Sequence, residues 1–222
     1  MAFSKQDIID GMREKGIVPL FTHDHEKEAL EVVEAAYRGG VRAFEFTNRR
    51  PNSFEIFSAL VRERKRFPDL MLGIGTVMDA DTTKKFIDAG ADFIISPILK
   101  LEMAEVCRLH NIAWIPGCAT LTEIVTAKEH GAAVIKIFPG SVLGPGFVSS
   151  ILPVVPDLKL MITGGVEPTR ENLSAWFKAG AMCVGMGSQL FTRDILQNRN
   201  WDLLSQKVSQ SLELVREIRA KS

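Results

Sequence analysis

The feature that most constrains the fold of this chain is a repeated alternation of short apolar runs with longer amphipathic segments. The midpoints of successive runs are about 20 to 28 residues apart, which is the length of one strand, one helix and two loops. Each run is closed by Gly, Pro or Thr, a pattern typical of buried parallel strands. The eight runs cover residues 17–21, 43–47, 70–76, 93–97, 113–117, 134–138, 158–164 and 183–187.

The segments between the runs have helical periodicity. Residues 26–37 place their apolar side chains on one stripe, and Asp24 is the expected N-cap. Residues 53–67 and 201–219 show the same periodicity. The glycines expected at helix C-termini are Gly39, Gly90, Gly131 and Gly180.

Eight strands alternating with eight helices, after a short N-terminal helix, predict an α/β fold in which residues 1–222 form a single (β/α)8 TIM barrel. A chain of 222 residues could also form two small domains, but no Pro/Ser linker or composition break divides it. The alternative is a doubly wound open sheet, which usually has about five to seven strands and a Gly-rich first turn. The first turn here, F-T-H-D-H at 21–25, contains no glycine. The barrel is therefore the prediction.

Charge and cysteine content narrow the possible partners. The chain has 27 Lys and Arg against 27 Asp and Glu, so no net charge steers it toward nucleic acid or a membrane, and a small-molecule partner is expected. The charge run at 62–66 could be a nucleic-acid patch, but it is more typical of a solvated helix C-terminus. Three cysteines without a C-x-x-C pair argue against a disulfide framework and a zinc site. No signal peptide or membrane span is apparent, which predicts a cytoplasmic protein.

Two ionisable residues interrupt the apolar runs, Glu45 in A-F-E-F-T and Lys136 in V-I-K-I-F. Because side chains alternate along a strand, the apolar flanks face the helices and the charges, together with Thr47, point into the barrel. Two structural interpretations are possible, a buried ion pair or an exposed lysine at a strand end. Buried ion pairs are rarely net stabilising, and the apolar flanks on both sides disfavour an exposed lysine. The functional interpretation is that Lys136 is a Schiff-base lysine whose pKa is lowered by burial. Glu45 would then be its acid/base partner.

Seven short motifs follow the runs in order: E-F-T-N-R at 45–49, G-I-G-T-V at 73–77, I-S-P at 95–97, I-P-G at 115–117, I-K-I-F-P at 135–139, T-G-G-V at 163–166 and G-S at 187–188. Together they resemble the 2-keto-3-deoxy-6-phosphogluconate / 4-hydroxy-2-oxoglutarate aldolase family over residues 17–190. The resemblance implies a metal-free class I aldolase without a cofactor, on a (β/α)8 barrel that is usually a homotrimer.

The resemblance also implies roles for individual residues. Lys136 matches the Schiff-base lysine and Glu45 the general acid/base, while Arg49 and Thr76 match the residues that bind the carboxylate of the pyruvyl portion. The remaining matches bind phosphate or line the pocket, namely Gly164, Gly165 and Ser188 for phosphate and Pro97 and Pro116 for the wall.

The residues themselves favour the same phosphate site. Thr163, Gly164 and Gly165 follow the seventh run, and Gly187 and Ser188 follow the eighth. Barrels commonly bind phosphate there through backbone N–H groups, which glycine lets an anion approach closely. The alternative is that these glycines form only tight turns.

Two segments depart from the family pattern. His23, Asp24 and His25 follow the first run, where an H-x-H pair could ligate a metal, remain solvated or contact substrate. The loop after the lysine run reads P-G-S-V-L-G-P-G at 139–146, where the family often has P-A. The resemblance therefore leaves the shape of the pocket on the aldehyde side, and with it the exact substrate, open.

The expected reaction is reversible cleavage of 2-keto-3-deoxy-6-phosphogluconate to pyruvate and glyceraldehyde 3-phosphate. The same mechanism on the C4 epimer, the phosphogalactonate form, or on 4-hydroxy-2-oxoglutarate is the nearest alternative. A phosphate-binding epimerase or decarboxylase would need a metal or a D-x-K-x-x-D cluster, which the lysine run lacks. A non-catalytic sugar-phosphate sensor would not need the Lys/Glu pair.

Overall fold

The computed structural model describes residues 3–221 and confirms the α/β barrel. Every strand pair is parallel, in the order β5-β4-β3-β2-β1-β9-β8-β7-β6. The strands are β1 (Ile17–Phe21), β2 (Ala43–Thr47), β3 (Met71–Gly75), β4 (Phe93–Ile95), β5 (Ala113–Ile115), β6 (Gly117–Cys118), β7 (Ile135–Ile137), β8 (Leu160–Thr163) and β9 (Cys183–Met186).

The fifth apolar run forms two short strands instead of one. Pro116 separates β5 from β6 and has no N–H to donate to a strand ladder. β5 pairs with β4, and β6 pairs with β7. These two strands are the ends of the sheet order, so the ring is completed through the chain itself at Pro116.

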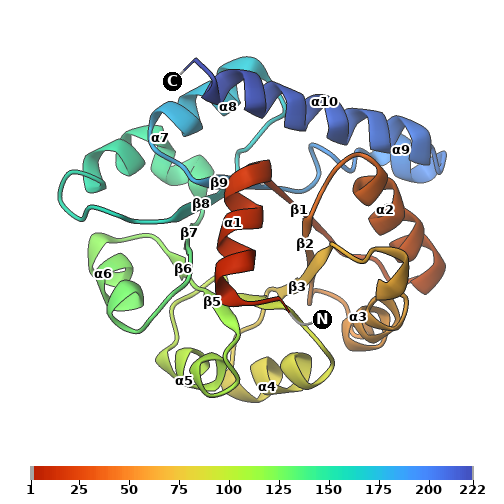
Figure 1. Cartoon of the computed structure of the whole chain (residues 1–222), viewed down its shortest axis with the longest axis horizontal. Coiled ribbons are helices and arrows are strands. Elements are labelled where there is room, and N and C mark those ends of the chain that lie inside the picture. Colours follow the sequence, from red (N-terminus) through yellow and green to blue (C-terminus); the bar gives the residue numbers. More distant parts are fainter. Residues whose placement is uncertain (1–2, 222) are drawn as a thin grey trace.

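All the helices except the first, which crosses the middle of the ring, surround the strands in Figure 1. The helices are α1 (Lys5–Lys15), α2 (Glu26–Arg38), α3 (Ser53–Arg62), α4 (Ala80–Asp88), α5 (Leu101–Leu109), α6 (Leu121–Glu129), α7 (Gly140–Ile151), α8 (Arg170–Lys178), α9 (Arg193–Gln197) and α10 (Trp201–Arg219). None of these helices, within the described part of the chain, is long and apolar enough to cross a membrane.

Three sequence expectations about helices need correction. The helix predicted at 53–67 ends at Arg62 and is followed by a 3-10 turn at Arg64–Arg66. Phe67 lies outside both helices, because the residue before a proline disfavours helical geometry. The N-cap of α2 is His25, so the expectation of Asp24 is wrong. The short helix α9 was not predicted, since its five residues are too few to show a periodicity.

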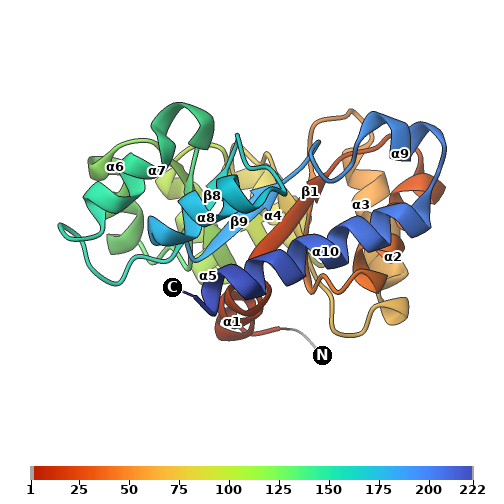
Figure 2. The same cartoon turned by 90° about the horizontal axis from the view of Figure 1, so that it is seen from above.

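Helix α1 covers one end of the barrel, where it lies across the centre of the ring in Figure 1 and below the strands in Figure 2. Its residues Ile8, Ile9 and Met12 are buried in one cluster with side chains from inside the barrel, including Val18 and Phe93. Because β1 begins directly after α1, the covered end is the amino end of the strands. The carboxyl ends, where TIM barrels carry their sites, are at the opposite end.

Candidate active site

Lys136 and Glu45 meet inside the barrel, as the strand alternation predicts. Lys136 is the middle residue of β7 and Glu45 the middle residue of β2, and these strands are separated by three others in the sheet order. The distance from Lys136 Nζ to Glu45 Oε1 is 4.0 Å, and the two side chains are 4% and 0% exposed. Neither carboxylate oxygen of Glu45 has a hydrogen-bond partner in the described residues.

A glycine on the neighbouring strand makes room for the carboxylate. Gly75 ends β3, and a Cβ atom at this position would lie 1.7 Å from Glu45 Oε1. The flanking residues Phe44 and Phe46 belong to the outer apolar core between the strands and the helices. Packing on both sides therefore fixes the direction of the Glu45 side chain.

Burial dominates the electrostatics of this pair. It lowers the pKa of Lys136 and raises the pKa of Glu45, because the interior disfavours both charged forms. The charge of Glu45 raises the pKa of Lys136, and the charge of Lys136 lowers the pKa of Glu45, so each partner opposes the effect of burial. Arg49 lowers the pKa of both groups. Such an environment favours a neutral amine, which can attack a carbonyl, beside a carboxyl group that can carry a proton.

Arg49 and Thr76 are brought together next to the pair. Arg49 Nε donates a hydrogen bond to Thr76 Oγ1 at 3.2 Å. Thr76 has a φ of 59°, in the left-handed region that few non-glycine residues adopt, directly after the end of β3. The guanidinium can offer a fork of donors to a carboxylate at this position.

A cavity of about 300 Å³ opens at the carboxyl ends of the strands. Of the residues expected to bind substrate, it is lined by Arg49, Thr163, Gly164, Gly165, Gly187 and Ser188. Lys136 and Glu45 do not line it. The cavity reaches Phe138, whose ring centroid is 5.1 Å from Lys136 Nζ.

Gly164 and Gly165 form a sharp turn after β8, with φ angles of 94° and 72°. A Cβ atom on Gly165 would lie 2.8 Å from the Cβ of Ser141, in the first turn of α7. Asn172 of α8 donates to the Gly165 carbonyl oxygen at 3.0 Å. The turn is thus held between α7 and α8 with its backbone at the cavity wall.

Pro97 and Pro116 lie beside the strands that carry the site, but neither lines the cavity. The Pro116 carbonyl oxygen accepts the backbone N–H of Lys136 at 2.9 Å. The backbone of Pro97 leaves no room for a side chain at Gly117, where a Cβ would lie 2.4 Å from its carbonyl oxygen. Both prolines contact the segments that position Lys136.

The histidines of the H-D-H segment interact with their own loop. His23 Nδ1 accepts the backbone N–H of His25 at 3.1 Å, and His23 Nε2 is 3.4 Å from Glu28. The His23 ring also stacks on Phe21, with centroids 5.8 Å apart. Within residues 3–221, no group of three or more His, Cys, Asp or Glu side chains could hold a metal ion.

The sequence analysis missed several residues of this region, among them Leu20, Thr22 and Phe138. Leu20 and Phe138 line the cavity, and Thr22 lines a smaller lobe beside it. Strand alternation in the first run could have identified two of these residues. Phe21 points outward, so its neighbours Leu20 and Thr22 face the inside of the barrel. Phe138 follows Lys136 by two residues, so it also shares the inner face.

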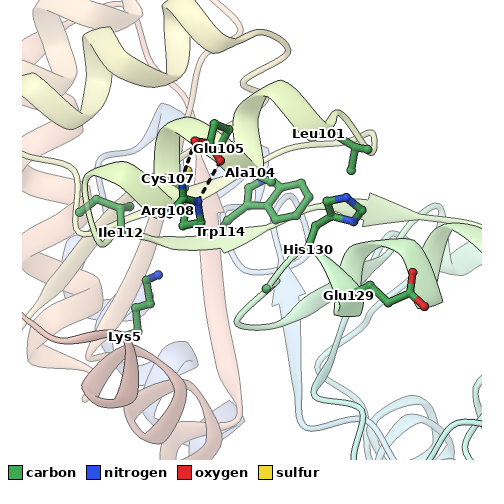
Figure 3. Close-up of a pocket in the computed structure, with 11 residues that line it drawn as sticks. Lys5, Leu101, Ala104, Glu105, Cys107, Arg108, Ile112, Trp114, Glu129 and His130 are labelled. Carbon is green, nitrogen blue, oxygen red and sulfur yellow. Dashed lines mark hydrogen bonds and ion pairs between the residues drawn. The ribbon is translucent and has the colours of Figure 1, made fainter.

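A second cavity, of about 400 Å³, lies away from these residues, between α5, α6 and α1 (Figure 3). It contains Trp114 from β5, and Arg108 is tied to Glu105 on its wall at 2.6 Å. None of the expected site residues lines it. The strand-end cavity, which six of the expected residues line, is therefore the candidate site.

The cysteines are poor nucleophiles in this fold. Cys107, Cys118 and Cys183 are buried and unpaired, and burial raises the pKa of each thiol to about 12. Their thiols are therefore protonated near neutral pH. Burial has the opposite effect on Lys136, whose pKa it lowers toward the neutral amine.

A (β/α)8 barrel with a cavity at the carboxyl ends of its strands has the architecture in which barrel enzymes carry their active sites. The family model for KDPG and KHG aldolases, the enzymes of 2-keto-3-deoxy-6-phosphogluconate and 4-hydroxy-2-oxoglutarate, matches residues 8–207. The chain belongs to this family, and it is an aldolase, a carbon–carbon lyase.

Curated relatives carry two substrate names. The chain is 31% identical to a 2-dehydro-3-deoxy-phosphogluconate aldolase of Pseudomonas aeruginosa over 203 residues, 90% of each chain. It is 34% identical to a 2-dehydro-3-deoxy-6-phosphogalactonate aldolase of Escherichia coli over 166 residues, which are 74% of this chain and 78% of that one.

Solved structures of similar proteins have the same fold. The native KDPGal structure superposes with a TM-score of 0.83 at 28% identity, covering 92% of this chain and 96% of that chain. The KDPG aldolase of Legionella pneumophila superposes with a TM-score of 0.80 at 27% identity, covering 90% and 96%. In that structure pyruvate is captured as a covalent carbinolamine intermediate.

Proposed function

We propose that this aldolase cleaves 2-keto-3-deoxy-6-phosphogluconate reversibly to pyruvate and glyceraldehyde 3-phosphate through a Schiff base on Lys136. The observation that carries the proposal is the buried pair of Lys136 and Glu45, 4.0 Å apart. The covalent pyruvate adduct of the Legionella pneumophila aldolase supports the chemistry.

In the proposed reaction, Lys136 acts first and Glu45 acts after it. The neutral Lys136 amine adds to the C2 ketone, and loss of water leaves an iminium that can accept electrons. Glu45 removes the C4 hydroxyl proton, the C3–C4 bond breaks, and its electron pair forms an enamine while the aldehyde leaves. The enamine takes a proton at C3 with help from Glu45, and water then releases pyruvate from the lysine.

The residues at the cavity suggest how the carboxylate and the phosphate of the substrate are bound. Arg49 and Thr76 hold the carboxylate next to the ketone, because the arginine fork can bind both oxygens. Thr163, Gly164, Gly165, Gly187 and Ser188 hold the phosphate at the other end of the cavity. The chain would use neutral donors there, because no Lys or Arg occurs at 163–166 or 185–190.

Borohydride reduction in the presence of pyruvate tests the nucleophile. The peptide that contains Lys136 should gain the mass of a reduced pyruvyl group, and Lys136→Met should gain none. Glu45→Gln should still trap pyruvate while turnover falls by about 10²- to 10⁴-fold, the usual contribution of a positioned acid/base. An adduct on another lysine would overturn the assignment.

The C4 epimer and 4-hydroxy-2-oxoglutarate are the second candidates for the substrate. The phosphogalactonate aldolase of Escherichia coli favours the first, since it matches at 34% identity, and the matched family, which includes KHG aldolases, favours the second. Comparing kcat/KM for the three compounds decides among them, and we expect the phosphogluconate form to be preferred.

We further propose that the enzyme is a cytoplasmic homotrimer. Met78, Leu101 and Val142, in segments that follow β3, β4 and β7, are 46%, 43% and 78% exposed, which supports burial against other subunits. Three unpaired cysteines suit a reducing compartment. Light scattering should give a mass about three times 24.6 kDa, and cell fractionation should recover the enzyme in the cytoplasm.

A further inference from the structure

Thr22 lies at the carboxyl end of β1, on the side that faces the barrel mouth. Phe21, the last residue of β1, packs outward against Phe191 with ring centroids 4.9 Å apart. Strand alternation therefore directs Thr22 inward. Its Oγ1 is shielded from solvent and has no hydrogen-bond partner in the described residues.

A second unpartnered hydroxyl lies on the neighbouring strand. The register pairs Leu20 with Glu45 and Phe21 with Phe46, so Thr22 is level with Thr47. Thr47 is 1% exposed, and its Oγ1 also lacks a partner among residues 3–221. Because buried hydroxyls are nearly always hydrogen-bonded, two such groups side by side indicate a partner supplied by a ligand.

A lobe of about 170 Å³ connects these hydroxyls with the candidate active site. It is lined by Thr22, Thr47, Arg49 and Ser188, among others, and shares Arg49 and Ser188 with the larger cavity. Among the described residues that line it, Arg49 is the only charged one. Two neutral hydroxyls, each able to donate and accept, suit a neutral hydroxyl group of the ligand.

The loop that carries Thr22 is fixed in place. Asn52, at the start of α3, donates from Nδ2 to the Asp24 carbonyl oxygen at 2.9 Å. Within the loop, the His25 N–H bonds to His23 Nδ1 at 3.1 Å. A hydroxyl on a fixed loop is preorganised and loses little freedom when it binds a ligand.

The groups near Thr22 and Thr47 correspond to the groups on either side of one hydroxyl of the proposed substrate. Glu45, proposed to take the C4 hydroxyl proton, precedes Thr47 by two residues on the same face of β2. Ser188, proposed for the phosphate, lines the same lobe as Thr22. The C5 hydroxyl of the substrate lies between the C4 hydroxyl and the phosphate.

We propose that Thr22, with Thr47 beside it, binds the C5 hydroxyl of the substrate and sets the preference of the enzyme for the configuration at that carbon. This inference rests on the proposed aldol cleavage. In the direction of synthesis, the group recognised is the 2-hydroxyl of glyceraldehyde 3-phosphate.

The test is aldol addition of pyruvate to three aldehydes by the full-length enzyme and by Thr22→Val, which keeps the shape of threonine and removes the hydroxyl. The aldehydes are D-glyceraldehyde 3-phosphate, its L enantiomer, and 3-phosphooxypropanal, which lacks the 2-hydroxyl. Thr22→Val should lose at least about fivefold in kcat/KM with the D aldehyde, because a buried substrate hydroxyl is left unpaired. Its rate with 3-phosphooxypropanal should stay within about twofold, and its D-over-L preference should fall by about the loss with the D aldehyde.

Two control variants isolate the hydroxyl. Thr22→Ser keeps it and should retain the wild-type pattern. Thr126→Val removes an exposed threonine hydroxyl that bonds to Thr122 within α6, and should change none of the three rates. If Thr22→Val does not fold, Thr22→Ala replaces it with the same expectation.

Equal losses on all three aldehydes, or no loss on any, would overturn the role of Thr22. Borohydride trapping of pyruvate separates this failure from failure of the proposed function. A wild-type enzyme that traps no pyruvate on Lys136 would refute the aldol mechanism itself. A variant that traps pyruvate normally but keeps its D-over-L preference would refute only the role of Thr22.

Discussion

Lys136 Nζ faces Glu45 Oε1 at 4.0 Å across the inside of the barrel, a separation too long for a hydrogen bond. Within residues 3–221, neither carboxylate oxygen of Glu45 has a hydrogen-bond partner. Burial is the largest influence on both groups, and it pushes the pKa of Lys136 down and the pKa of Glu45 up. The pair thus differs from a structural ion pair, in which a short contact would stabilise both charges.

The first prediction concerns pH. The negative charge of Glu45 raises the pKa of Lys136, so Glu45→Gln should lower that pKa further. Because the proposed mechanism needs the neutral Lys136 amine to attack pyruvate, the midpoint of borohydride trapping against pH should move to lower pH in Glu45→Gln. Glu105→Gln, which alters an exposed carboxylate paired with Arg108, is the control and should leave the midpoint unchanged. A midpoint that moves upward would show that Glu45 does not act on the charge of Lys136.

The second prediction concerns the space beside Glu45. Gly75→Ala places a Cβ 1.7 Å from Glu45 Oε1, so the carboxylate must move. Turnover should fall by about 10²- to 10⁴-fold, as for loss of the acid/base, while pyruvate trapping on Lys136 persists.

Gly146→Ala is the matched control for Gly75→Ala, because nothing lies within 4 Å of a Cβ at that position. It should leave turnover unchanged and raise the free energy of unfolding by up to about 1 kcal/mol. Steady-state rates and urea unfolding check both variants. Normal turnover in Gly75→Ala would mean that the position of Glu45 does not limit the reaction.

The third prediction concerns the phosphate end. Ser188→Ala removes one donor at the cavity, and a hydrogen bond to a charged group contributes about 1.5 to 3 kcal/mol, or roughly 10- to 150-fold in binding. KM for the phosphorylated substrate should rise within that range, whereas cleavage of 4-hydroxy-2-oxoglutarate, which has no phosphate, should hardly change. Ser209→Ala on the exposed surface of α10 serves as control. Equal effects on both substrates would place the phosphate elsewhere.

The sequence was sufficient to predict the barrel and the meeting of Lys136 with Glu45, because both depend on strand alternation, which is a local pattern. The division of the fifth run at Pro116 was not predicted, since it depends on which strands pair on either side of the ring. The cap of α2 was mispredicted because His23 Nδ1 accepts the His25 N–H and the helix then begins after His25.

The lobe at Thr22 also required the structure. The first run predicts only that Thr22 faces inward. That its hydroxyl is level with Thr47 follows from the register between β1 and β2, and a register is a relation between distant parts of the chain. The connection of the lobe to Ser188 depends in the same way on the pairing of β1 with β9.

The last prediction separates the two ends of the barrel. Ile8 of α1 is 0% exposed and packs in the inner cluster at the amino end of the strands. Ile8→Ala should lower the free energy of unfolding by about 2 to 5 kcal/mol, because it leaves a cavity in a core that cannot fully close. Leu109→Ala removes a 67% exposed side chain and should change it by no more than about 0.5 kcal/mol.

Urea unfolding measures both changes, and kcat/KM of the folded enzyme is measured alongside. Since Ile8 lies at the end opposite the strand-end cavity, kcat/KM of Ile8→Ala should remain within about twofold of wild type below its unfolding transition. A large loss of activity without loss of stability would show that α1 acts on the site through the barrel interior. In that case the inner cluster would position Lys136 and Glu45 as well as support the fold.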